Sequence, residues 1–181
     1  MDNGESSYRR FLEGDEDAFG ELVKEYRDSL TFFINRYVKD LHTAEDIAID
    51  VFVELLTHPR KYNFKSSVKT WLFMIGRCRA LDHIKHNKVL KITELSEAYD
   101  IGMNDLEESV LSDERKRVIH EALSKLPEEM RTAVYLVYFA DMSYAEAAKV
   151  MKKSYKQIDN LLYRAKKELR SILGKEGALL I

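Results

Sequence analysis

The sequence contains few of the residues that interrupt helices. Its 181 residues include two prolines and seven glycines, and these residue types are the least compatible with a helix interior. Apolar side chains recur at the three- and four-residue spacing of amphipathic helices along nearly the whole chain. We therefore predict an all-α fold.

Cysteine and long apolar stretches are also scarce. Cys78 is the only cysteine, which excludes an internal disulfide and is typical of a reducing compartment. No stretch reaches the roughly 18 consecutive apolar residues of a transmembrane helix. The first ten residues, MDNGESSYRR, are polar with no apolar run behind them. These absences predict a cytoplasmic protein with neither a signal peptide nor membrane insertion.

The net charge of −2 conceals a segregation of charge along the chain. Residues 1–58 hold fourteen acidic and six basic side chains, and residues 60–91 hold nine basic side chains and one acidic one. Residues 93–114 hold eight acidic side chains and no basic one, whereas residues 149–170 hold eight basic and two acidic ones. Two basic segments separated by an acidic one predict two contacts with a polyanion. Solvated helix faces are the alternative.

The helical pattern divides the chain into two domains. It is strong over residues 15–39, from Thr43 to the residue before His58, and over 68–87, and these three helices can bury one core. Residues 88–111 are acidic and less periodic, and further helical stretches follow at 113–125, 128–140, 144–151 and 155–172. We predict small helical domains at 1–88 and 112–181, joined by an acidic linker at 89–111.

Two helix-start signals lie close together in the second domain. Ser143 precedes Glu146, and Ser154 precedes Gln157, by three positions. This is the spacing of a capping box, in which each side chain satisfies a backbone amide of the other residue. A short helix followed by a longer basic one fits a helix-turn-helix, whose second helix enters the DNA major groove. A plain helical hairpin is the alternative.

The predicted helix from Thr43 has an apolar face and an acidic one. The apolar face contains Ile47, Val51, Phe52, Leu55 and Leu56. Asp46, Asp50 and Glu54, at i, i+4 and i+8, form an acidic ridge. The ridge is either an ordinary solvated face or a docking surface for a basic partner.

The segment from Tyr62 to His86 combines basic and aromatic side chains. Basic groups neutralise phosphates, and flat rings stack on unpaired bases. The segment therefore suits a single nucleic-acid strand. We expect Trp71 to pack in the core instead, because aromatic residues at helical spacing are more often buried.

Two stretches together resemble a known family. LPEEMRTAVYLVYFADMSYAEAAKVMKKSYKQIDNLLYRAKKEL, from Leu126 to Leu169, resembles the C-terminal promoter-reading domain of bacterial RNA polymerase sigma factors of the extracytoplasmic-function (ECF) group. TAEDIAIDVFVELL followed by KTWLFMIGRCRALDHIK resembles their N-terminal domain. The resemblance implies an alternative sigma factor that binds core RNA polymerase at its clamp coiled coil and flap, opens the minus-10 element and reads the minus-35 element of promoter DNA. An anti-sigma factor is a further candidate partner.

The resemblance also implies roles for individual residues. Asp46, Asp50 and Glu54 would dock on the basic coiled coil of the polymerase. Contacts with minus-10 DNA would come from Tyr62, Asn63, Phe64, Lys65, Ser66, Lys69, Arg77, Arg79, His83, Lys85 and His86. Contacts with minus-35 DNA would come from Ser143, Lys153, Ser154, Tyr155, Lys156, Gln157, Asn160, Arg164 and Lys167. Asp159 and Leu161 stand where the family often carries basic residues. The promoter preference of other family members is therefore not assigned to this sequence.

Catalytic and metal-binding arrangements are not evident in the sequence. The five histidines form no catalytic constellation. Cys78 with His83 and His86 lacks the paired spacing of a zinc site, and no Glu-x-x-His pair is present for a carboxylate metal site. We expect neither an enzyme nor a cofactor. A conventional helix-turn-helix regulator with an N-terminal sensing or dimerisation domain is the main alternative, and a helical nuclease is another.

Overall fold

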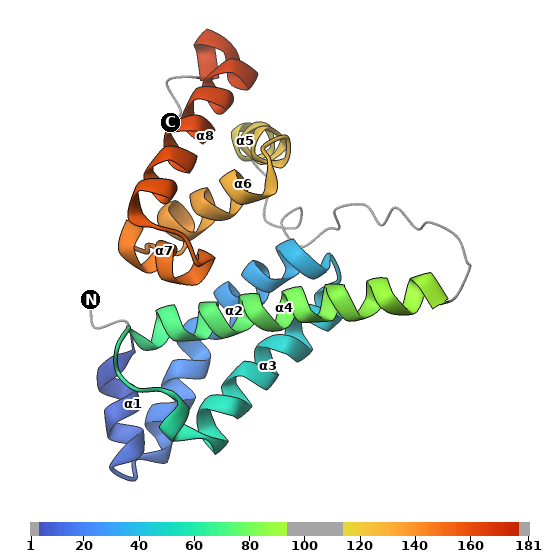
Figure 1. Ribbon diagram of the computed structural model, residues 1–181. Coiled ribbons are helices and arrows are strands. Elements are labelled where there is room, and N and C mark those ends of the chain that lie inside the picture. Colours follow the sequence, from blue (N-terminus) through green and yellow to red (C-terminus); the bar gives the residue numbers. More distant parts are fainter. Residues whose placement is uncertain (1–3, 94–113, 178–181) are drawn as a thin grey trace. The chain divides into compact units, whose positions relative to one another are not determined.

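The computed structural model describes residues 4–93 and 114–177, which form eight α-helices, a 3₁₀ turn and a π-helical turn, and no strand (Figure 1). The predicted all-α fold is confirmed. The chain divides into two compact units, Met1–Met103 and Asn104–Ile181.

The first unit is built around the long helix α2 (Glu16–Val38). Helices α1 (Glu5–Leu12), α3 (Leu41–Thr57) and α4 (Val68–Thr93) all pack against α2 (Figure 1), and the 3₁₀ turn η1 (Pro59–Lys61) follows α3. The core includes Tyr8, Leu22, Leu30, Phe33, Ile34, Val51, Leu55, Leu72 and Phe73. Gly76 permits the close approach of α2 and α4, because a Cβ there would lie 3.0 Å from Leu30 Cδ1 and 3.2 Å from Ile34 Cδ1.

Helix boundaries in this unit differ from the prediction at two places. The Asp40 carboxylate accepts a hydrogen bond from Thr43 N–H at 2.8 Å, so α3 begins at Leu41 and Thr43 lies in its first turn. The predicted start at Thr43 is wrong because a stronger cap residue precedes it. Helix α4 continues to Thr93, beyond the predicted end at 87. The predicted linker therefore begins inside a helix, and its residues from 94 onward lie outside the described part.

The second unit packs α5 (Glu114–Ser124), α6 (Glu128–Val134) and α7 (Tyr144–Met151) against α8 (Tyr155–Gly177) (Figure 1). Helix α6 continues into the π-helical turn η3 (Tyr135–Phe139). Together, α6 and η3 cover most of the predicted helical stretch 128–140. The core includes Met130, Leu136, Ile158, Leu162, Ala165 and Leu169. Helix α8 extends beyond the predicted end at 172 and is interrupted at Gly174, where φ is 68°.

Candidate nucleic-acid interface

Both predicted capping boxes form. Ser143 N–H donates to Glu146 Oε2 at 2.9 Å, and Glu146 N–H donates to Ser143 Oγ at 3.3 Å. Ser154 N–H donates to Gln157 Oε1 at 2.7 Å, and Gln157 N–H donates to Ser154 Oγ at 3.2 Å. These bonds fix the starts of α7 and α8, so the two helices and the turn between them have the order and lengths of a helix-turn-helix.

The turn between the two helices is closed by lysines. Lys152 adopts a left-handed conformation with φ 54°, which a glycine would adopt at less cost. The N–H of Lys153 donates to Ala148 O, five residues earlier, at 2.9 Å. A hydrogen bond over this sequence separation is typical of a helix that ends in a left-handed residue. The chain therefore makes the turn without the glycine that this position often carries.

Helix α8 separates an apolar face from a polar one. Its buried side chains include Ile158, Leu161, Leu162 and Ala165. The outer side exposes Lys156, Asn160, Tyr163, Arg164 and Lys167, which we call the reading face. Tyr163 was absent from the predicted contacts. The sequence could have predicted this exposed position, because helical spacing places Tyr163 beside Asn160 and Arg164 and away from the core.

Several residues predicted to contact minus-35 DNA have structural partners. The Gln157 side-chain oxygen is occupied by the capping bond with Ser154. Lys153 Nζ lies 2.8 Å from Glu129 Oε1 of α6. The Ser143 and Ser154 hydroxyls accept from helix amides. These residues hold the two helices in place.

An aromatic and basic cluster lies on the flank of the helix-turn-helix. The rings of Tyr144 and Tyr155 are 5.5 Å apart, and Lys166 Nζ lies 5.4 Å from the centre of the Tyr138 ring. A hydrogen bond with Tyr138 raises the pKa of Lys166. Partial burial raises the pKa of Tyr144, and the nearby Tyr138 and Asp159 act in the same direction.

In the first unit, the base of the loop between η1 and α4 is packed into an aromatic cluster. The ring centre of Tyr62 lies 5.3 Å from that of Tyr8, 4.7 Å from that of Phe64 and 6.2 Å from that of Trp71. Tyr62 is 3% exposed, and its hydroxyl donates to Ser66 O at 2.6 Å. Tyr62 therefore supports the loop from below and does not present a free face to a base. Trp71 is also buried, as predicted.

The tip of the same loop remains accessible. Asn63 and Lys65 are exposed, and Asn63 Oδ1 accepts from Lys65 N–H at 3.2 Å. Phe64 has a left-handed backbone with φ 58° and is partly exposed. The Arg9 guanidinium of α1 lies 4.3 Å from the centre of the Phe64 ring, a cation–π contact. Helix α1, which lies outside the predicted helices, therefore helps to hold this loop.

A buried tyrosine attaches α1 to the rest of the unit. The Tyr8 hydroxyl donates to Leu55 O at 3.2 Å, and the side chain is fully buried. Burial raises the pKa of Tyr8 to about 12.

Helix α4 distributes the remaining predicted minus-10 contacts over different sides. Lys69 and Arg77 are partly exposed, and Arg77 Nε is buried without a hydrogen-bond partner among the described residues. His83 Nε2 lies 2.8 Å from Asn87 Nδ2. Lys85 and His86 are exposed, and Lys85 Nζ lies 3.7 Å from Asp82 Oδ1. Their angular spacing around a helix means that they do not form one continuous row.

The acidic ridge of α3 is partly neutralised within the unit. Arg79 Nη2 lies 2.5 Å from Glu54 Oε2, and Arg79 Nη1 lies 3.2 Å from Asp50 Oδ2. Lys61 Nζ lies 2.7 Å from Glu54 Oε1. The hydrogen bonds from Lys61 and then from Arg79 lower the pKa of Glu54. Of the predicted ridge, Glu54 is therefore an internal ion-pair partner, whereas Asp46 is exposed.

An apolar stripe borders the ridge. Ile49, Val53 and Leu56 have exposed fractions between 44% and 53%, and their spacing of four and three residues places them on one side of α3. The prediction that Leu56 belongs to the buried face is wrong, because no neighbouring helix covers that side within the described unit. We call Ile49, Val53 and Leu56 the apolar stripe.

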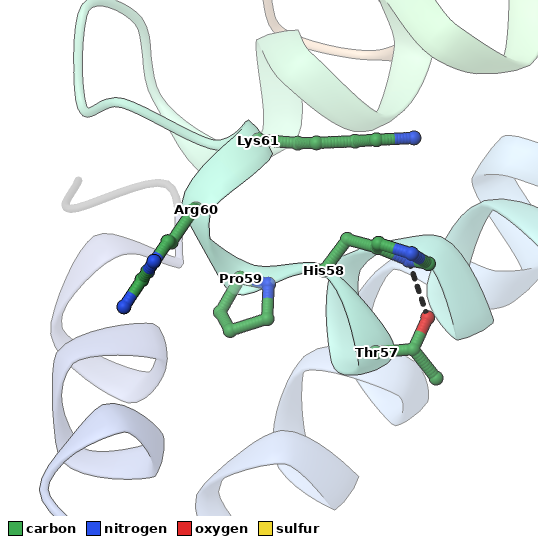
Figure 2. A pocket seen from close by; sticks show the side chains of 5 residues that line it. All are labelled: Thr57, His58, Pro59, Arg60 and Lys61. Carbon is green, nitrogen blue, oxygen red and sulfur yellow. Dashed lines mark hydrogen bonds between the residues drawn. The ribbon is translucent and has the colours of Figure 1, made fainter.

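A hollow with a volume of about 390 Å³ lies where α3 ends, and it is lined by five consecutive residues, Thr57 to Lys61. Figure 2 shows Arg60 and Lys61 pointing in different directions, with the Thr57 hydroxyl bonded to His58 Nδ1 at 2.8 Å. Lys61 is bonded to Glu54. The hollow is a surface feature of one turn, and it gathers no polar groups from other elements.

Two family models match the chain. Sigma-70 region 2 matches residues 22–89, and Sigma-70 region 4 matches residues 116–169. The ECF RNA polymerase sigma factor SigM of Bacillus subtilis is 28% identical over 86% of this chain and 94% of its own length. The RNA polymerase sigma-H factor of Pseudomonas aeruginosa is 27% identical over 91% of this chain and 90% of its own length. This chain is an ECF RNA polymerase sigma factor.

The sigma factor also resembles solved structures in its fold. CnrH in complex with the cytosolic domain of CnrY aligns with a TM-score of 0.66 at 20% identity, over 96% of this chain and 97% of that chain. RpoE in complex with the anti-sigma factor NepR from Bartonella quintana aligns with a TM-score of 0.64 at 20% identity, over 86% of this chain and 96% of that chain. These likenesses support the helical fold.

The family assignment gives the function of the chain. As an alternative sigma factor, it binds core RNA polymerase and promoter DNA and directs promoter-specific transcription. The region 2 match contains the ridge and the loop, and the region 4 match contains both capping boxes. Within the described residues, no helix has the length and apolar character needed to cross a membrane.

Proposed function

We propose that the two units of this sigma factor divide promoter recognition between them. The first unit binds core RNA polymerase and opens the minus-10 element, and the second unit reads the minus-35 duplex. The observation that carries this proposal is the pair of helices α7 and α8, each of which begins with a capping box. Helix α8 presents the polar and basic reading face.

Core polymerase would dock on the outer side of α3. The apolar stripe is exposed beside Asp46 and Asp50, and exposed apolar side chains rimmed by charge are typical of protein interfaces. Glu54 is not part of this proposed contact, because Lys61 and Arg79 already bind its carboxylate. An anti-sigma factor, the kind of partner present in the RpoE structure, would inhibit this chain by covering the apolar stripe.

The minus-10 strand would be held at the tip of the loop. Asn63 and Lys65 are exposed there, so the Asn63 NH₂ group would donate to a base edge and the Lys65 side chain would contact a phosphate. Tyr62 anchors the loop from below. Lys69 and Arg77 would neutralise phosphates along the strand, whereas Arg79 is occupied by the ridge.

The minus-35 duplex would receive the reading face in its major groove. Asn160 is suited to the paired acceptor and donor of adenine, and Arg164 to the two acceptors of guanine. Tyr163 would contact a thymine methyl group or a sugar, and Lys156 and Lys167 would contact phosphates. The capping boxes hold this face in one orientation, which favours base discrimination over simple electrostatic binding.

In vitro transcription with core polymerase tests the proposal. Genomic fragments should yield discrete transcripts only when both core enzyme and this protein are present. The double variant Asn63→Ala, Lys65→Ala should retain core binding but reduce permanganate reactivity of unpaired thymines, since it alters the loop tip and leaves Phe64 and its packing unchanged. Strong sequence-specific binding to duplex by the protein alone, with no effect of core enzyme, would instead support a conventional helix-turn-helix regulator.

A further inference from the structure

Asp159 is the one exposed acidic side chain on α8 between residues 155 and 174. Glu168, the other acid in this span, is partly buried. The exposed basic residues of the same span are Lys156, Arg164, Lys166, Lys167 and Arg170. A carboxylate in such a setting lowers attraction to phosphates, so its presence on a DNA-binding helix calls for a specific role.

The structure gives Asp159 no such role inside the protein. Among the described residues, its carboxylate lies close enough to the Tyr144 side chain to interact with it electrostatically, but it forms no ion pair with a basic side chain and caps no helix. It lies next to Asn160 and four residues before Tyr163, in the N-terminal half of α8. That half is the part of a recognition helix that approaches base edges. Asp159 is therefore placed to meet DNA, and among the described residues no basic side chain is paired with its carboxylate.

We propose that Asp159 is a specificity-determining residue that accepts a hydrogen bond from the amino group of a cytosine in the minus-35 element. This inference rests on the proposed role of α8 as the minus-35 reader. An ionised carboxylate can only accept hydrogen bonds. In the major groove, cytosine presents a lone amino donor at N4, whereas guanine presents two acceptors and thymine presents an acceptor and a methyl group.

Adenine is the closest competitor to cytosine at such a site. It offers an amino donor at N6, but the N7 acceptor beside it repels a carboxylate. Asp159 would thus discriminate partly by repulsion, which lowers total affinity and raises selectivity. Asn160, its neighbour, carries both a donor and an acceptor, so the two adjacent residues would prefer different bases.

Selection from a randomised minus-35 library tests the inference, with holoenzyme reconstituted from core polymerase and the full chain. Wild type should enrich cytosine over thymine about tenfold at one position, which corresponds to about 1.4 kcal/mol. Asp159→Ala should lose that enrichment at that position alone, because sites with another base there lose the repulsion and bind more tightly, whereas the cytosine site also loses its hydrogen bond. Asp159→Asn should shift the preference at the same position toward adenine, because an amide both donates and accepts. Arg170→Ala, which changes the charge of α8 by one in the opposite direction, is the control: it should weaken binding to all sites alike and leave every base preference unchanged.

The outcomes separate this inference from the function on which it rests. Unchanged base preferences at every position in Asp159→Ala, with a uniform gain in affinity, would overturn the role of Asp159 and leave the minus-35 reader intact. If wild-type holoenzyme enriched no base at any minus-35 position, the proposed role of α8 would fail, and the role of Asp159 would fail with it.

Discussion

Replacing Glu54 with glutamine should destabilise the first unit without altering its apolar core. The Glu54 carboxylate binds Lys61 at 2.7 Å and Arg79 at 2.5 Å, and its side chain is 15% exposed. Glutamine preserves the length of the side chain but removes the charge. Its amide NH₂ also presents a donor to one of the two cations, where the carboxylate presented an acceptor.

The expected size of this effect depends on how far water screens the two partners. The side chains of Arg79 and Lys61 are 36% and 55% exposed. Exposed ion pairs contribute about 0.2–1 kcal/mol each, whereas hydrogen bonds to a charged group contribute about 1.5–3 kcal/mol. Two bonds to a mostly buried carboxylate with partly screened partners therefore contribute about 2 kcal/mol. In a unit of this size, losing them lowers Tm by roughly 8–16 °C.

The effect should also depend on pH. The hydrogen bonds from Lys61 and Arg79 lower the pKa of Glu54 in the folded state. A carboxyl group with a lowered folded pKa contributes its stability above the unfolded pKa, which is about 4.3. That contribution is lost as pH falls through the folded pKa. The difference in unfolding free energy between wild type and Glu54→Gln should therefore be constant near neutral pH and disappear in acid.

Trp71 makes the measurement specific to this unit. It is the only tryptophan of the chain, and it is 6% exposed, so urea unfolding followed by its fluorescence reports the first unit. Glu45→Gln, an exposed acid on the same helix, is the matched control and should change the unfolding free energy by less than about 0.5 kcal/mol. An equally small change for Glu54→Gln, or a large change that persists at acidic pH, would refute the stabilising role of this ion-pair network.

Other predictions concern contacts that fix the two units. Tyr8→Phe removes the bond to Leu55 O and should lower the unfolding free energy by about 1–3 kcal/mol, measured by Trp71 fluorescence; an unchanged midpoint would contradict this. Lys153→Ala breaks the pair with Glu129, so it should lower the thermal stability of the second unit by up to about 1 kcal/mol while the salt dependence of holoenzyme binding stays the same; a flatter salt slope would indicate a phosphate contact instead. Asn160→Ala should cost about 1–3 kcal/mol at particular minus-35 bases, and identical base preferences to wild type in a library selection would remove Asn160 from the reading face.

The sequence by itself determined the features that depend on neighbouring residues. A capping box needs only a serine and an acceptor side chain three positions later, so both helix starts at Ser143 and Ser154 could be predicted. The spacing of apolar residues along α8 likewise predicted which side of the helix is buried and which is exposed, because the helical period depends on the helix alone. The predicted start at Thr43 failed for a local reason as well, since Asp40 is the better cap.

Only the tertiary structure decided which polar and aromatic side chains are available to a partner. The sequence predicts that Arg79 contacts the minus-10 DNA strand. The packing of α3 against α4 instead places Arg79 beside Glu54, which is 25 residues away in the sequence. The sequence likewise predicts that the Tyr62 ring contacts minus-10 DNA, but in the structure Tyr8 of α1 packs against that ring and Tyr62 is buried. Leu56 is exposed because the neighbouring helices pack on other sides of α3. Spacing along one helix shows which residues share a side, whereas burial and ion pairing depend on which distant element packs against that side.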